Sequence, residues 1–145
     1  MFDVGPGRKG STVESKYYFM LGGAASLVAL ITYSIGAIGV SRSKGASRTA
    51  VIFLWVGFVA DVVTTGLMAL GNSGFDFSPG IGITHTIIGF IVMAGMLAAA
   101  IAATLALPKA REGATPAIAR WVLVPWVAWV LMFIWAAASR GGTRS

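Results

Sequence analysis

Four long stretches of the chain are almost wholly apolar, and short polar segments separate them. The stretches cover residues 17–40, 49–70, 84–107 and 116–139. Each has at least about 20 residues, which at about 1.5 Å per residue spans the hydrocarbon core of a bilayer. The pattern predicts an all-α protein, an integral membrane bundle of four transmembrane helices at 17–139. A polar lead (1–16) and a polar tail (140–145) flank this domain.

Local signals place the ends of three of these helices. Ser11 followed by Glu14 has the spacing of a capping box, so the first helix is expected to begin near residue 12. Pro108 cannot continue the third helix, which ends before it. Thr115 followed by Pro116 is the order of an N-cap and a first helical residue, so the fourth helix is expected to begin there.

The composition supports a membrane location and excludes several kinds of site. Hydrophobic residues make up 57% of the chain and charged residues 11%, and the mean hydropathy is +0.82. A soluble protein is about half apolar and one quarter charged. The net charge of +6 comes from residues in short loops and tails, where they meet lipid head groups, so we expect no nucleic-acid partner. The absence of cysteine excludes disulfides and thiolate-bound metals.

Lysine and arginine are divided almost evenly between the two membrane faces. Five lie on the face with both termini and the 71–83 loop, and six lie on the opposite face. The loops at 41–48 and 108–115 are short and basic, whereas 71–83 has no lysine or arginine. We therefore expect both termini outside and the two basic loops in the cytoplasm.

Small residues recur along two of the expected helices. In lipid, helices associate through close backbone approach and hydrogen bonds, because the hydrophobic effect does not drive them together. We expect these strips to face neighbouring helices. They are Gly22, Ser26, Ala29 and Gly36 in the first helix, and Ala94, Ala98, Ala102 and Ala106 in the third.

The fourth helix is bulky and aromatic. Trp121 and Trp135 lie 14 positions apart in the sequence, so both are expected near the membrane interfaces. Trp126 and Trp129 are expected in the middle of the membrane. The simplest interpretation is a helix whose aromatic side chains face lipid. The alternative is a face that contacts a partner protein or a flat ring cofactor.

Asp61 is the one acidic residue deep inside an apolar stretch. A carboxylate there costs about 2.5–3.5 kcal/mol on insertion scales, so something must offset it. Thr65 follows at i+4, with Thr64 beside it, and their hydroxyls can donate to Asp61. We expect Asp61 to be protonated at neutral pH unless it faces water or a cation.

Three roles for Asp61 remain open from the sequence. It can be a hydrogen-bond clamp between helices, with Ser34, Tyr33 or a backbone carbonyl as its partner. It can be a relay for protons or cations. It can also meet a polar group of another subunit or of a bound ligand.

His85, the single histidine, begins the third helix between two threonines. Counting from the helix ends puts Met20 and Met68 at a similar depth, and a histidine–methionine pair can ligate haem iron. The alternative is an interfacial histidine bonded to a loop carbonyl. One histidine is too few for an ordinary metal site, and no Ser-His-acid set or phosphate-binding glycine loop is present. We therefore expect no catalytic residues and no metal.

Several short motifs follow one another in a recognisable order between about Tyr33 and Trp129. They are YSIG at 33–36, F-x-W-x-G at 53–57, Asp61 with TTGLM, His85-x-x-x-Gly89, A-x-x-A-T-x-x-L at 100–107 and W-x-x-W at 126–129. With these motifs the chain resembles the HsmA family of small uncharacterised bacterial four-helix membrane proteins. Further family histidines fall on Ala99 and Ala119 here, so a paired-histidine haem site does not carry over. The resemblance implies the bacterial inner membrane and no agreed activity.

Three functions are consistent with these features. The one we favour is a non-catalytic structural protein or an accessory subunit, with other membrane subunits or its own copies, and lipid, as partners. The second is a redox protein that binds haem through His85 and Met68 or Met20. The third is a proton-coupled small-molecule transporter that uses Asp61. We predict no cofactor for the favoured role.

Overall fold

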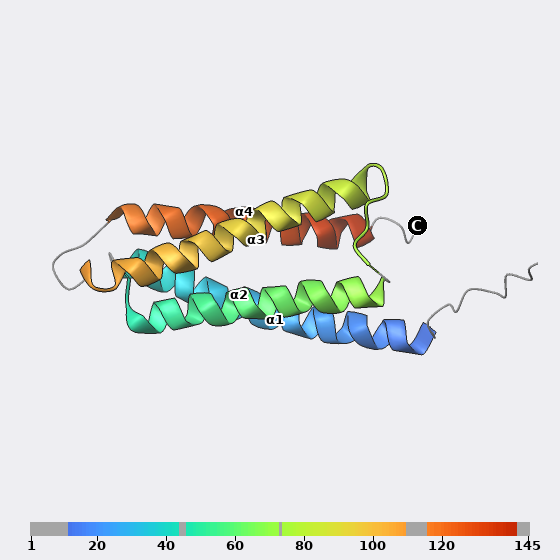
Figure 1. Cartoon of the computed structure of the whole chain (residues 1–145), viewed down its shortest axis with the longest axis horizontal. Coiled ribbons are helices and arrows are strands. Elements are labelled where there is room, and N and C mark those ends of the chain that lie inside the picture. Colours follow the sequence, from blue (N-terminus) through green and yellow to red (C-terminus); the bar gives the residue numbers. More distant parts are fainter. Residues whose placement is uncertain (1–11, 44–45, 73, 110–115, 142–145) are drawn as a thin grey trace, which may run out of the picture.

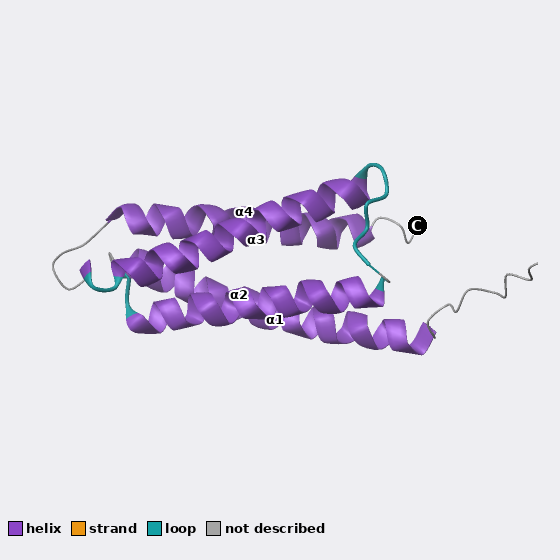
Figure 2. Cartoon of the chain, in the orientation of Figure 1, coloured by secondary structure: helices purple, strands orange, loops and turns teal. Residues whose placement is uncertain are grey.

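The computed structural model describes residues 12–43, 46–72, 74–109 and 116–141. These residues form four helices joined by loops, with no strand among them, which confirms the all-α bundle (Figure 2). The helices are α1 (Thr12–Arg42), α2 (Arg48–Gly71), α3 (Ile81–Ala106) and α4 (Pro116–Gly141). All four are long and apolar enough to cross a membrane. The protein is therefore a multi-pass integral membrane protein.

The helices run alternately up and down and form two hairpins (Figure 1). We call α1 with α2 the first hairpin and α3 with α4 the second hairpin. Each helix packs beside the helix before it and the helix after it, and α4 closes the ring against α1. The start of α1, the end of α4 and the α2–α3 loop all lie at one end of the bundle, where the two hairpins stand apart (Figure 1).

The helix ends agree closely with the expectations from sequence. The hydroxyl of Ser47 accepts a hydrogen bond from the Ala50 backbone N–H, so α2 begins at Arg48. The third helix begins earlier than expected because Gly80, with a φ of 90°, turns the loop directly into it. The N-capping roles expected for Ser11 and Thr115 lie outside the described residues.

Two glycines let the backbones of the first hairpin come into contact. A Cβ atom on Gly36 would lie 2.8 Å from the backbone nitrogen of Leu54, and one on Gly57 would lie 2.6 Å from that of Tyr33. No side chain fits in either place. Close approach of this kind is the main source of helix association in lipid, where the hydrophobic effect contributes little.

The two small-residue strips have different surroundings. The first-helix strip faces α2: Gly22 lies against Met68, and Ser26 and Ala29 are buried. In α3, Ala94 and Ala98 are exposed in the single chain, and Ala102 is half-buried. The adjoining positions are covered instead, with Ala99, Ala100 and Ala103 in the core.

Side-chain hydrogen bonds join the two hairpins within the membrane-spanning segments, and we describe four between residues that the structure covers. Three are donated by tryptophan indoles and one by a tyrosine hydroxyl. The pairs are Trp129 Nε1 to Asp61 Oδ1 (3.1 Å), Trp126 Nε1 to Ser34 Oγ (2.9 Å), Trp55 Nε1 to Thr104 Oγ1 (3.0 Å) and Tyr33 Oη to the Met96 carbonyl (3.3 Å). Water is absent from the hydrocarbon core, so these bonds also satisfy groups that would otherwise lack partners.

The mid-membrane tryptophans therefore point inwards, which corrects the simplest interpretation of the fourth helix. Trp129 is only 3% exposed and Trp126 is half-buried. Both donate to polar residues of the first hairpin. Trp121, by contrast, is 71% exposed, as an interfacial side chain would be.

Candidate functional site

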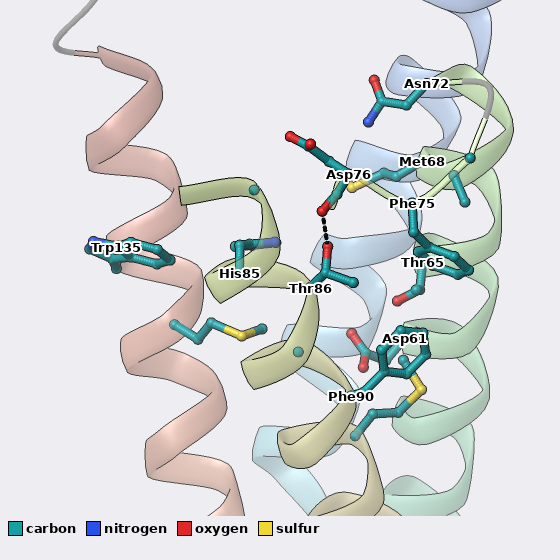
Figure 3. A pocket seen from close by; sticks show the side chains of 16 residues that line it. Asp61, Thr65, Met68, Asn72, Phe75, Asp76, His85, Thr86, Phe90 and Trp135 are labelled. Carbon is teal, nitrogen blue, oxygen red and sulfur yellow. Dashed lines mark hydrogen bonds between the residues drawn. The ribbon is translucent and has the colours of Figure 1, made fainter. Parts of the chain in front are cut away.

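A cavity of about 350 Å³ lies between the two hairpins at the end that carries the α2–α3 loop (Figure 3). Its walls come from α2, from residues 74–76 of the loop, from α3 and from the last part of α4. No residue of α1 lines it. The volume is near the lower end of the range of small-molecule pockets, about 300–1,000 Å³.

Glycines contribute to the space in this region. Gly82 and Gly89 of α3 both line the cavity. A Cβ atom on Gly89 would meet no atom within 4 Å, so the cavity wall is open there. Below this opening the indole bonds hold the two hairpins together. The cavity is therefore an open space between the two hairpins, which the indole hydrogen bonds hold together further from the loop.

Asp61 forms the floor of the cavity and is 8% exposed. Its Oδ1 accepts the hydrogen bond from Trp129, which is the one donor to this carboxyl among the described residues. Its second oxygen has no protein partner in that part of the chain. The carboxyl lies beside the open space in Figure 3. It is therefore a deeply buried polar group with unused capacity for a hydrogen bond or an ion pair.

The partners expected for Asp61 from the sequence bond elsewhere. The Thr64 hydroxyl donates to the Ala60 carbonyl of its own helix. Ser34 accepts from Trp126, and Tyr33 donates to the Met96 carbonyl. Thr65 lines the cavity one turn above Asp61. The clamp between helices exists, but its second member is Trp129.

His85 and Met68 face the same cavity from opposite hairpins. The imidazole ring stacks on Trp135, with the centroids 6.0 Å apart and the planes at 27°. Met93 and Met132 also line the space. Met20 does not, because it lies on α1 with 75% of its side chain exposed. The structure thus brings together two of the three residues predicted to bind haem.

The α2–α3 loop folds over the mouth of the cavity. The Thr86 hydroxyl donates to the backbone carbonyl of Asp76 (2.7 Å), which ties the loop to α3 (Figure 3). Hydrogen bonds from the side chain and backbone N–H of Ser78 hold the pKa of the Asp76 carboxyl below its usual value. Asp76 is therefore ionised at neutral pH. A negative charge stands at the mouth, above Asp61 at the floor.

The lining combines acidic groups with aromatic and sulfur-containing side chains. It has two carboxyls and one imidazole, and no lysine or arginine. Phe75 of the loop packs edge-on against Phe90 of α3, with their centroids 5.1 Å apart. No serine or cysteine nucleophile lines the cavity, and the described residues contain no group of three metal-ligating His, Cys, Asp or Glu side chains. The arrangement is suited to binding a ligand.

Sequence reasoning missed the loop's contribution to this site. Nothing in the periodicity of the chain shows that Phe75 and Asp76 fold back over the end of α3. The sequence did contain one indication of this contribution. Two aromatic residues and an acidic residue stand among the glycines of the segment 71–83. Binding residues are often carried on loops that a rigid scaffold positions.

Searches of protein-family models, of curated proteins and of solved structures found no match to this chain. The resemblance to the HsmA family stays a prediction. The site must therefore be interpreted from its own geometry.

Proposed function

We propose that this multi-pass membrane protein is a non-catalytic binding protein that holds a small organic molecule between its two hairpins. One observation carries the proposal. Asp61, a buried carboxyl within a membrane-spanning helix, has a free oxygen that faces a cavity large enough for such a molecule. Ionisable residues inside membrane segments are costly, and they are found mostly at functional sites.

A purely structural role explains only part of this geometry. A clamp between α2 and α4 needs the bond from Trp129 to Asp61, but it needs no open space on the other side of the carboxyl. Close packing would have filled that space, because an unfilled gap forfeits contacts along its lining. The role as an accessory subunit of a larger membrane complex remains compatible with ligand binding. We retain it as the setting in which the binding protein works.

The proposed location is the bacterial inner membrane with both termini outside. In that orientation the mouth of the cavity, where residues 74–76 of the α2–α3 loop lie, opens towards the outer face. A ligand then enters from the aqueous phase or from the outer leaflet. The two basic loops lie in the cytoplasm, as the distribution of lysine and arginine favours.

Haem is the second candidate, because His85 and Met68 share the cavity. The charge of the lining argues against it. A haem carries two anionic propionates, and the cavity offers them Asp61 and Asp76 but no lysine or arginine. An absorption spectrum of the protein purified in mild detergent decides this point. A Soret band lost in His85→Ala would favour haem over our proposal.

Native mass spectrometry of the same sample tests the proposed binding function. We expect the chain to carry a small molecule that survives gentle ionisation. Gly89→Leu places a side chain in the cavity, where a Cβ meets no atom, and should remove that molecule. Gly66→Leu is the matched control, since Gly66 also has no atom within 4 Å but does not line the cavity. Equal occupancy in both variants would contradict the proposal.

A further inference from the structure

We infer that the molecule held in the cavity is a small organic monocation, such as a quaternary ammonium or a protonated amine with an aromatic or branched apolar body. The inference deepens the proposed function and rests on it. It follows from the charge and the aromatic lining of the cavity, and from the lack of a metal-binding cluster among the described residues.

The charged side chains of the cavity favour a ligand with a positive charge. Asp76 is ionised at the mouth, and Asp61 has a free oxygen at the floor. No lysine or arginine lines the cavity, and its one basic side chain is the imidazole of His85, which stacks on Trp135. A ligand cation beside Asp61 would offset the cost of an ionised carboxyl in the membrane. An anionic ligand would be repelled by Asp76 at the mouth and would find no lysine or arginine in the cavity.

The aromatic and methionine side chains that line the cavity favour an organic cation over a metal ion. Phe75, Phe90 and Trp135 line the cavity, and ring faces attract weakly hydrated cations. Methionines supply a polarisable surface that adapts to an apolar body. Calcium takes about six to eight oxygen ligands around one point, and magnesium about six including its waters. The oxygen-bearing side chains of the cavity are instead spread from Asp76 at the mouth to Asp61 at the floor, and the described residues contain no group of three His, Cys, Asp or Glu side chains that could hold a metal ion.

The depth of Asp61 determines how the ligand lies. The mouth is formed by the loop, whereas Asp61 lies three helical turns below it on α2, facing Trp129. A cationic group that reaches Asp61 places its apolar body among Phe75 and Phe90, where the cavity wall is aromatic. Trp129 keeps Oδ1 occupied, so the free Oδ2 is the oxygen that pairs with the cation.

A matched pair of probes tests the inference. Phenyltrimethylammonium and tert-butylbenzene have nearly the same shape and differ in charge. Binding of each to the full-length protein in lipid nanodiscs is measured by equilibrium dialysis, with empty nanodiscs subtracted. We expect saturable binding of the cation. Asp61→Asn keeps an oxygen for Trp129 but loses the charge, and should weaken cation binding by about thirtyfold or more. It should leave the neutral probe unaffected.

Two further variants keep the test decisive if Asp61→Asn does not fold. Asp76→Asn should weaken cation binding alone, whereas Phe90→Leu should weaken binding of both probes, because Phe90 packs against the apolar body that they share. Equal binding of both probes, unchanged in Asp61→Asn and Asp76→Asn, would overturn the cation inference and leave the binding function intact. If neither probe binds and Gly89→Leu changes nothing that co-purifies, the proposed function itself fails. Cation binding that survives Gly89→Leu would place the site elsewhere and also overturn the inference.

Discussion

The indole Nε1–H of Trp129 in α4 donates a 3.1 Å hydrogen bond to Oδ1 of Asp61 in α2. The bond joins the two hairpins directly at the floor of the cavity. The bond gives the indole N–H an acceptor, which hydrocarbon cannot provide, and it gives one oxygen of the buried Asp61 carboxyl a donor. The other side of this carboxyl stays open to the cavity. One residue thus helps to hold the bundle together and offers a free acceptor to a ligand.

The two roles of Asp61 separate on substitution. Asparagine retains a carbonyl oxygen for Trp129, so Asp61→Asn should leave the free energy of unfolding nearly unchanged. Leucine has no acceptor, so the indole N–H of Trp129 would be left without a hydrogen-bond partner. Asp61→Leu should therefore destabilise the bundle by about 0.5–2 kcal/mol. Reversible unfolding in detergent or bicelles measures both.

A double-mutant cycle isolates the bond itself. Trp129→Phe removes the donor and keeps most of the ring. If the pair interacts as described, the effects of Trp129→Phe and Asp61→Leu should not add. Strict additivity would show that the stabilising contribution of Asp61 comes from somewhere else.

The sequence predicted the spans and their ends well because both depend on local properties. The length of each apolar stretch and the break at Pro108 can both be recognised from residues that are close together in the sequence. The first-helix strip was found for the same reason, since the small residues Gly22, Ser26, Ala29 and Gly36 recur at helical spacing. These features require no knowledge of which helices are neighbours.

The rotation of α3 and α4 about their own axes could not be predicted in this way. Alanines occupy so many positions between 94 and 106 that their spacing selects no face. Trp126 and Trp129 are suited both to the membrane interface and to hydrogen bonds inside the bundle. Whether these two side chains face lipid or the interior of the bundle depends on their hydrogen-bond partners. These partners, Asp61 and Ser34, lie 68 and 92 positions away in the sequence. Periodicity carries no information about such pairs.

The other indole bonds should stabilise the bundle as well. Trp55→Phe removes the donor to Thr104 and should lower the free energy of unfolding by about 0.5–1.5 kcal/mol. Trp121→Phe is the matched control, because Trp121 is largely exposed and outside this set of bonds. Unfolding of both variants in the same detergent compares them. A loss of equal size in both would point to packing of the ring rather than to the hydrogen bond.

The contact between α1 and α2 should be sensitive to a single methyl group. Gly57→Ala puts a Cβ against the backbone of Tyr33, where there is no room, and should destabilise the protein by about 1–3 kcal/mol. Gly66→Ala lies on the same helix and meets nothing within 4 Å, so it should be neutral or slightly stabilising. Thermal unfolding followed by circular dichroism distinguishes them. A Gly57→Ala variant as stable as Gly66→Ala would mean that α1 and α2 do not approach this closely.

The orientation in the membrane can be tested without first removing any cysteine, since the chain has none. Pro79→Cys lies in the loop at the cavity mouth, and Lys109→Cys follows the end of α3 on the opposite face. Both positions are exposed, so both thiols should react once the membrane is permeabilised. With both termini outside, a membrane-impermeant maleimide should label Pro79→Cys in intact cells and should reach Lys109→Cys only after lysis. The reverse pattern would place the cavity mouth in the cytoplasm, so that a ligand would have to enter from the inner leaflet or from the cell interior.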